Sequence, residues 1–303
     1  MPPIRLLPFA AASGAGNMAR DEALLLSAAD RGVASLRFYT WTEPTVSLGY
    51  FQPAAERLPE LAYVRRATGG AAIVHDPPTE ITYSLALPPG PHWQPPGESW
   101  ICRMHYFVRD VLRAKWGVTA KAVVCGEEQK LGPVLCFLHH TPGDLVVEAR
   151  VRFSEQSKRF FYSPRRGVVA VSSGARTAGE GHCGVSPPHP RSAAPSLPSP
   201  QRGEGENTLH KIAGSAQRKW KGALLQHGSI LLARSPFAPQ LPGVTDLTGV
   251  SIDRHHLAAA VVEHFTTQTG WAIEPGDWTA DELAHADRTT ADKYAAADWN
   301  EKR

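Results

Sequence analysis

Cationic side chains stand beside paired glycines in the stretch from Arg65 to Asp76, which reads Arg-Arg-Ala-Thr-Gly-Gly-Ala-Ala-Ile-Val-His-Asp. Glycine has no side chain to block the approach of a ligand to the backbone, and it tolerates positive φ. Arginine presents a planar fork of donors that suits anionic groups. The stretch therefore predicts a pocket for a ligand that is anionic or carries an amide. Because adjacent strand residues face opposite sides, we expect one of Arg65 and Arg66 to point inward and the other outward, with one of them structural.

A second stretch of similar character begins at Lys211 and reads Lys-Ile-Ala-Gly-Ser-Ala-Gln-Arg, and Gln-His-Gly-Ser follows it at 226–229. Cys136 lies between the first stretch and these later ones, in the apolar sequence Leu-Cys-Phe. Taken alone, such a cysteine is more often a small buried hydrophobic residue than a nucleophile. A thiol with an ordinary pKa is only a few per cent thiolate at about pH 7, so a catalytic cysteine would need a neighbouring cation or base.

Composition excludes several classes of protein. The 303 residues carry a formal net charge of +3, and their basic and acidic residues are interspersed, so no nucleic-acid footprint is expected. The four cysteines show neither a Cys-x-x-Cys pair nor zinc-ligand spacing, which predicts free thiols in a reducing compartment, no metal site and a cytoplasmic location. No stretch is long and apolar enough to span a membrane, and the first residues predict a strand and loop rather than a signal peptide.

The elements that must position these residues follow from periodicity and capping signals. Alternation and β-branched or aromatic residues predict strands at 37–41, 44–52, 80–87, 135–137 and 143–147. Helices are predicted from Asn17 as N-cap, from Ser99 through 112 or beyond, from Asp253 to about 269, and from Thr279. On the second of these helices, Cys102 and His105 are expected to be packing residues rather than ligands.

The two glycine-containing blocks, in this order, resemble the biotin/lipoate protein ligase and octanoyltransferase superfamily, whose members handle small acyl cofactors destined for a lysine on a carrier domain. The resemblance covers nearly all of the chain. It implies an α/β fold of the α+β type, with a mixed, largely antiparallel sheet flanked by helices, in a single catalytic domain spanning 1–303. An insertion at about 150–207 interrupts this domain, and its later part has almost no large apolar residues, so we expect it to be disordered. No accessory domain is expected after the last helix.

The Cys136-Phe137 pair, shortly before Gly143-Asp144, resembles the Cys-Phe motif of the cysteine-dependent M-type octanoyltransferases. This resemblance implies that Cys136 forms the acyl-enzyme and that Lys211, which matches the family's lysine, favours the thiolate or stabilises the oxyanion. The histidines after it, His139 and His140, are expected to be solvated in a loop. The resemblance also implies the following substrate-binding residues: Arg66, Thr68, Gly69, Gly70, Ala71, His75, Tyr83, Gly214, Ser215, Ala216, His227 and Gly228.

Some of these residues leave alternatives open. Ala71 stands where the M-type enzymes commonly carry arginine and the ATP-dependent ligases carry a third glycine, so it favours neither class. His75 could line the pocket or pack as a strand-end residue. His227 could take part in chemistry or shape the strand turn.

Three functions remain as hypotheses. The first is transfer of octanoyl or lipoyl from acyl carrier protein through a Cys136 thioester to a lysine of glycine cleavage H protein or of the lipoyl domains of 2-oxoacid dehydrogenases, with no cofactor. The second is an ATP-dependent lipoate-protein ligase acting through lipoyl-AMP, which would require ATP and magnesium. The third is a non-catalytic homologue that binds carrier domains. Biotin also stays open as the ligand.

Overall fold

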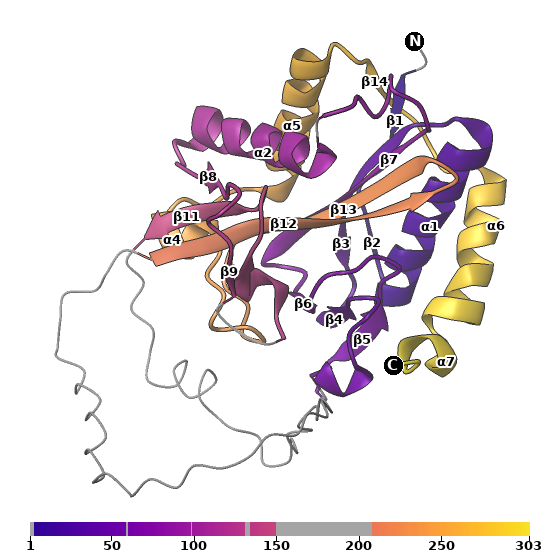
Figure 1. The fold of residues 1–303 in the computed structure, drawn as a ribbon, viewed down its shortest axis with the longest axis horizontal. Coiled ribbons are helices and arrows are strands. Elements are labelled where there is room, and N and C mark those ends of the chain that lie inside the picture. The colour runs from indigo at the N-terminus through magenta and orange to yellow at the C-terminus, as the bar shows by residue number, and fades with distance from the viewer. Residues whose placement is uncertain (1–2, 59, 98, 131–133, 150–207) are drawn as a thin grey trace, which may run out of the picture.

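The computed structural model describes residues 3–58, 60–97, 99–130, 134–149 and 208–303 (Figure 1). The insertion expected at about 150–207 lies outside the described residues. The helices are α1 (Gly14–Arg31), α2 (Trp100–Trp116), α4 (Val244–Thr248), α5 (Arg254–Thr269), α6 (Ala280–Thr289) and α7 (Ala297–Asn300). The strands are β1 (Ile4–Leu6), β2 (Ala10–Ala12), β3 (Ser35–Trp41), β4 (Thr45–Leu48), β5 (Ala62–Arg65), β6 (Ile73–His75), β7 (Glu80–Leu87), β8 (Lys121–Ala122), β9 (Gln129–Lys130), β10 (His139–His140), β11 (Leu145–Ala149), β12 (Thr208–Trp220), β13 (Ala223–Leu231) and β14 (Ile273–Pro275).

One mixed sheet organises the molecule. Within the described residues it has nine strands in the order β14-β1-β3-β7-β13-β12-β11-β8, with β2 added alongside β3. The central pairs, β3 with β7, β7 with β13, β13 with β12 and β12 with β11, are antiparallel, whereas β1 pairs in parallel with both β3 and β14. The expected α+β class, with a largely antiparallel sheet flanked by helices, is confirmed.

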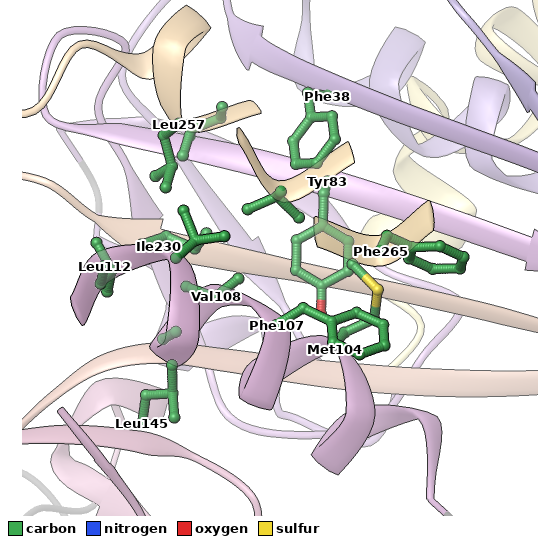
Figure 2. Packing of buried hydrophobic residues seen from close by; sticks show 14 of the residues in the cluster. Phe38, Tyr83, Met104, Phe107, Val108, Leu112, Leu145, Ile230, Leu257 and Phe265 are labelled. Atoms are coloured by element: carbon green, nitrogen blue, oxygen red, sulfur yellow. The ribbon is translucent and has the colours of Figure 1, made fainter. Parts of the chain in front are cut away.

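Helices cover both faces of this sheet (Figure 1). The α2 and α5 helices pack together over one face, where alternate residues of β3 and β7 meet Met104, Val108 and Phe265 in the main hydrophobic core (Figure 2). The α1 helix crosses the opposite face, and α6 packs against its outer side. Ser99, Asp253 and Thr279 accept hydrogen bonds as the N-caps of α2, α5 and α6, as expected.

The first helix begins earlier than the sequence predicts. Its N-cap is Ser13, not Asn17. Asn17 is fully buried inside α1, where its side-chain amide donates to the carbonyls of Ala12 and Thr40. An asparagine side chain often forms hydrogen bonds with nearby backbone groups, which is why Asn17 was expected to be an N-cap. Here the backbone groups that it contacts belong to β2 and β3 instead of the start of the helix.

A smaller sheet, β5-β4-β6, carries the first glycine block at its edge. The segment that contains Cys136 lies against this block, because Ala72 N donates to Val134 O at 3.0 Å and Cys136 N donates to Ala72 O at 2.7 Å. Residues Cys136–Leu138 form a 3₁₀ turn, so the strand expected at 135–137 is wrong. The β12–β13 hairpin then brings the second glycine block to the same place, although about 140 positions separate the two blocks in sequence.

Candidate active site

A cavity lies where the two glycine blocks and the Cys136 turn meet. It is lined by Met18, Tyr39, Trp41, Arg66, Gly69, Gly70, Ile73, His75, Thr82, Cys136, Gly214, Ser215, Ala216, His227, Gly228 and Ser229. Ten of the fourteen residues that the resemblance selected therefore share one cavity. The other four residues do not line the cavity, but each forms a hydrogen bond with a residue that does: Thr68, Ala71, Tyr83 and Lys211.

Cys136 presents a half-buried sulfur to this cavity. The Lys211 ammonium lies 3.6 Å from Cys136 Sγ and 3.4 Å from the Cys136 carbonyl oxygen. A cation beside a cysteine stabilises the thiolate, which is the nucleophilic form. The closure of the β11–β12 ladder thus brings together a cysteine and a lysine that are 75 residues apart.

Lys211 is itself held by a carboxylate. Its Nζ lies 2.7 Å from Asp144 Oδ2, and both side chains are 2 % exposed. The same carboxylate oxygen accepts from the backbone N–H and the hydroxyl of Thr141, each at 2.8 Å. A side chain at Gly214 would place its Cβ 2.5 Å from Lys211 Cε, so glycine is needed there for Lys211 to reach the sulfur.

Both arginines of the first block are buried, so the expectation that one faces outward is wrong. Other segments of the chain cover Arg65 and Arg66 on both sides of the backbone. Arg65 is the structural member of the pair: its guanidinium donates to the carbonyls of Gly49, Gln52 and Asn300 and so ties this loop to α7.

Arg66 lines the cavity and is surrounded by neutral oxygens. Its Nη1 donates to the carbonyl and hydroxyl of Ser47 at 2.5 and 2.8 Å, and its Nη2 donates to the carbonyls of Gly69 and Ala71 at 3.1 and 3.0 Å. Ala71 thus contributes through its backbone. Burial lowers the pKa of Arg66 to about 10, against an opposing effect of Cys136, so this guanidinium stays charged at neutral pH.

His75 combines both roles that its sequence left open. Its ring lines the cavity and stacks on Trp41 at a centroid distance of 3.8 Å. Its Nδ1 lies 2.7 Å from Glu80 Oε1, and a carboxylate can only accept, so Nε2 accepts from the Ser47 hydroxyl at 2.7 Å. Burial lowers the pKa of His75, although Glu80 opposes this shift.

His227, like His75, is held between a carboxylate and a hydroxyl group. Its Nδ1 lies 2.8 Å from Asp21 Oδ2, and its Nε2 lies 2.7 Å from Thr68 Oγ1. Burial opposes ionisation of Asp21, but Arg37 at 2.7 Å and hydrogen bonds from His227 and Ser84 outweigh it and lower the pKa of Asp21. Through Thr68, this buried carboxylate fixes the glycine loop that borders the cavity.

His105 is packed inside the protein, as expected, but its ring also contacts a residue of the cavity wall. It is fully buried, and its two ring nitrogens lie 2.6 Å from Gly143 O and 2.6 Å from Ser215 Oγ. The Tyr83 hydroxyl oxygen also lies 2.6 Å from Ser215 Oγ, and burial raises the pKa of Tyr83 to about 12. The signal in the sequence was a histidine on the apolar face of an amphipathic helix, where a polar group needs a partner.

His140 also departs from expectation, because it is 2 % exposed rather than solvated. Burial lowers its pKa, and the nearby Lys211 acts in the same direction. It belongs to β10, which pairs with β9 beside the Cys136 turn.

Sequence reasoning missed the carboxylates that hold these side chains. Asp21, Glu80 and Asp144 are each no more than 4 % exposed. The signal for Glu80 was available, since Glu80, Thr82 and Ser84 alternate with apolar residues along β7 and so had to share one face. The aromatic walls Tyr39 and Trp41 were likewise visible as alternate residues of a strand. No comparable pattern marks Asp144.

Neither a metal site nor a membrane-spanning helix is found among the described residues. They hold no group of three or more His, Cys, Asp or Glu side chains placed to bind a metal ion. No helix in this part of the chain has the length and apolarity to cross a membrane.

Comparisons with known proteins agree with this geometry. Residues 13–130 match the family described as lipoyl protein ligase A/B catalytic domain. The chain is 30% identical to octanoyltransferase LipM of Kyrpidia tusciae, over 99% of this chain and 98% of that protein. It shares its fold with a lipoate-protein ligase A bound with ATP (TM-score 0.64, 20% identity, 99% of each chain). The same holds for a bipartite lipoate protein ligase of Thermoplasma acidophilum, studied with its E2 lipoyl domain (TM-score 0.59, 18% identity, 99% and 96% of the chains). The chain therefore belongs to the lipoyl protein ligase A/B catalytic-domain family, and it is an enzyme of that family.

Proposed function

We propose that this enzyme is an octanoyltransferase of protein lipoylation that works through a thioester on Cys136. The observation that carries the proposal is the half-buried sulfur of Cys136 in the cavity, 3.6 Å from the Lys211 ammonium. The relatives named octanoyltransferase match over the full chain, which supports the same acyl group.

In the first step, the Cys136 thiolate attacks the carbonyl carbon of an octanoyl thioester on acyl carrier protein. A new C–S bond forms, and the carbonyl electron pair moves to oxygen to give a tetrahedral oxyanion. The oxyanion collapses, the bond to the donor's sulfur breaks, and the departing thiolate takes up a proton. Cationic donors held in a buried site stabilise such an oxyanion without reorganising.

In the second step, the neutral ε-amine of a carrier-domain lysine attacks the Cys136 thioester. A C–N bond forms, the amine nitrogen loses a proton, and the Cys136 thiolate leaves, which restores the enzyme. The ion pair of Lys211 with Asp144 lies beside the sulfur and can pass protons in both steps. The acceptor is a lipoyl-type carrier domain, consistent with the structural relative studied with an E2 lipoyl domain.

The residues that line the cavity suit an acyl chain. Met18, Tyr39, Trp41 and Ile73 supply apolar surface, and the glycine blocks allow backbone to approach the ligand closely. A side chain at Gly228 would bring its Cβ 2.2 Å from Ser215 Oγ and 2.8 Å from Tyr83 Cε1, so this wall of the cavity depends on glycine.

The test is acylation of a lipoyl domain with two alternative acyl sources. One reaction contains octanoyl-acyl carrier protein and no nucleotide, and the other contains free octanoate, ATP and Mg²⁺. We expect transfer only in the first, and its loss in Cys136→Ala. Cys125→Ala is the matched control, because Cys125 is exposed and lies outside the cavity. Acylation only in the second reaction, unaffected by Cys136→Ala, would instead identify an ATP-dependent ligase.

A further inference from the structure

Lys211, which lies 3.6 Å from Cys136 Sγ, and Arg66, which lines the same cavity as Cys136, differ in how their charge is balanced. Lys211 forms a buried ion pair with Asp144 at 2.7 Å, so the pair as a whole carries no net charge. Arg66, by contrast, donates to four neutral oxygens, those of Ser47 (two), Gly69 and Ala71. Within the described part of the chain, no carboxylate forms an ion pair with Arg66. The cavity therefore contains a buried positive charge that no carboxylate of the described residues neutralises.

The free donor of Arg66 strengthens this difference. Arg66 is 3 % exposed, and its Nε is buried without a hydrogen-bond partner in the described structure. A buried donor without an acceptor is destabilising, and a buried charge without a counter-ion is more so. Such a group is expected where a ligand or a reacting anion completes the site. Arg66 and Cys136 line the same cavity, so the anion that completes it can be the thiolate itself.

We propose that Arg66 supplies the unbalanced positive charge that stabilises the Cys136 thiolate, whereas the Lys211–Asp144 pair positions the cysteine turn and carries protons. Lys211 suits the second role because it also donates to the carbonyls of Cys136 and His139 on either side of the 3₁₀ turn. After acylation the sulfur is neutral, and the charge of Arg66 becomes available to the carbonyl oxygen of the thioester or to its oxyanion. The inference rests on the proposed function for this role in turnover, but the thiolate can be measured without any substrate.

The other titratable groups around the site do not supply this charge. Burial lowers the pKa values of His75 and His140, so both rings are neutral at neutral pH. Asp144 is paired with Lys211. Arg66 remains charged, since its pKa stays near 10 despite burial.

The experiment measures the rate at which iodoacetamide alkylates Cys136 between about pH 5 and pH 9, with the Cys136 peptide identified by mass spectrometry. For Arg66→Gln we expect alkylation at neutral pH to slow roughly tenfold and the midpoint of the profile to rise by about one unit, because a nearby opposite charge is lost. Arg66→Lys, which keeps the charge, should lie between this variant and the wild type. Arg65→Gln is the matched control: it should lower thermal stability and leave the midpoint in place.

A double variant, Asp144→Asn with Lys211→Met, removes the neutral pair and keeps Arg66. If Arg66 holds the thiolate, the alkylation midpoint of the double variant stays less than about one unit above that of the wild type, because the removed pair has no net charge and only the hydrogen bond from Lys211 Nζ to Cys136 Sγ is lost. This variant decides the question even if Arg66→Gln does not fold. A midpoint raised by a full unit in the double variant, or an Arg66→Gln profile that superimposes on the wild type, would overturn the proposal. Failure of octanoyl transfer in other assays would not affect these outcomes.

Discussion

The two faces of β7 are equally buried and chemically opposite. Ile81 and Leu85 are fully buried in the hydrophobic cluster that contains the apolar side chains of α2 and α5. Glu80 and Ser84, on the other face, are just as inaccessible, but they meet His75, Ser229 and the Asp21 carboxylate. Burial by itself therefore does not distinguish core from site. The difference lies in what each buried group requires of its neighbours.

The apolar face gains free energy from area alone, at about 25 cal/mol per Å² removed from water, and tolerates changes that conserve volume. The polar face is stable only while each charge and donor keeps its partner, because an unpaired group retains its full desolvation cost. We conclude that the apolar face gives the sheet its stability, and that the polar face holds the side chains around the cavity in place. The predictions below test this division.

The largest effect is expected on the polar face. Asp21→Ala leaves the buried Arg37 guanidinium without its carboxylate and removes the partner of His227 Nδ1. The free energy of unfolding should fall by about 3–5 kcal/mol, the cost typical of breaking a buried ion pair. Urea denaturation measures it. A loss below about 1 kcal/mol, the scale of a surface ion pair, would mean that this face is not held as described.

On the apolar face, a substitution should lower the free energy of unfolding by leaving a cavity in the core. Leu85→Ala opens a cavity against α2 and α5 and should cost about 2–5 kcal/mol in urea denaturation, with kcat per folded molecule unchanged. Ser84→Ala on the adjacent position is the matched control, and should cost only about 1 kcal/mol for one hydrogen bond. Equal losses for the two variants would contradict the division between the faces.

A third change displaces Lys211 through its neighbour on the strand. Gly214→Ala forces Lys211 away, because the added Cβ would lie 2.5 Å from its Cε. Octanoyl transfer should fall about tenfold or more, because the proposed mechanism needs Lys211 beside Cys136. The melting temperature should fall as well, because the buried ion pair of Lys211 with Asp144 is lost. Lys219→Ala, at the exposed end of the same strand, is the control and should change neither quantity. A wild-type rate in Gly214→Ala would show that the position of Lys211 is not critical.

The smallest effect is a dependence of stability on pH. Burial lowers the pKa values of His75 and His105 in the folded state, so below about pH 6.5 the unfolded chain binds more protons than the folded one. The free energy of unfolding should therefore fall by about 1–2 kcal/mol between pH 7.5 and pH 5.5. His105→Asn should flatten this slope. Stability that rises on acidification would contradict neutral, buried rings.

Much of the framework was visible in the sequence because it depends on local signals. The caps at Ser99, Asp253 and Thr279 and the alternation at 80–87 each arise within a few residues, and all are confirmed. The glycine blocks could be assigned to one cavity because their order resembles a known family. The roles of Cys136 and Lys211 in chemistry remain predictions, although the structure brings the two side chains together.

The remainder depends on distant partners. Asp21 meets His227 across 206 positions, and His105 meets Ser215 across 110, so no local pattern could show that these polar residues belong to the site. The burial of both Arg65 and Arg66 was missed for a related reason. Strand alternation predicts that two adjacent residues point to opposite sides of the strand. It does not predict whether other segments of the chain cover both of those sides.

The most direct test of the account is the intact mass of the enzyme after mixing with octanoyl-acyl carrier protein, without ATP and without an acceptor domain. We expect the wild type to gain one octanoyl group, labile to hydroxylamine, and the Cys136→Ala protein to gain none. Addition of a lipoyl domain should then discharge the wild-type adduct onto the domain. An adduct of equal yield in Cys136→Ala, or transfer to the lipoyl domain with no adduct formed on the wild type, would contradict the thioester mechanism.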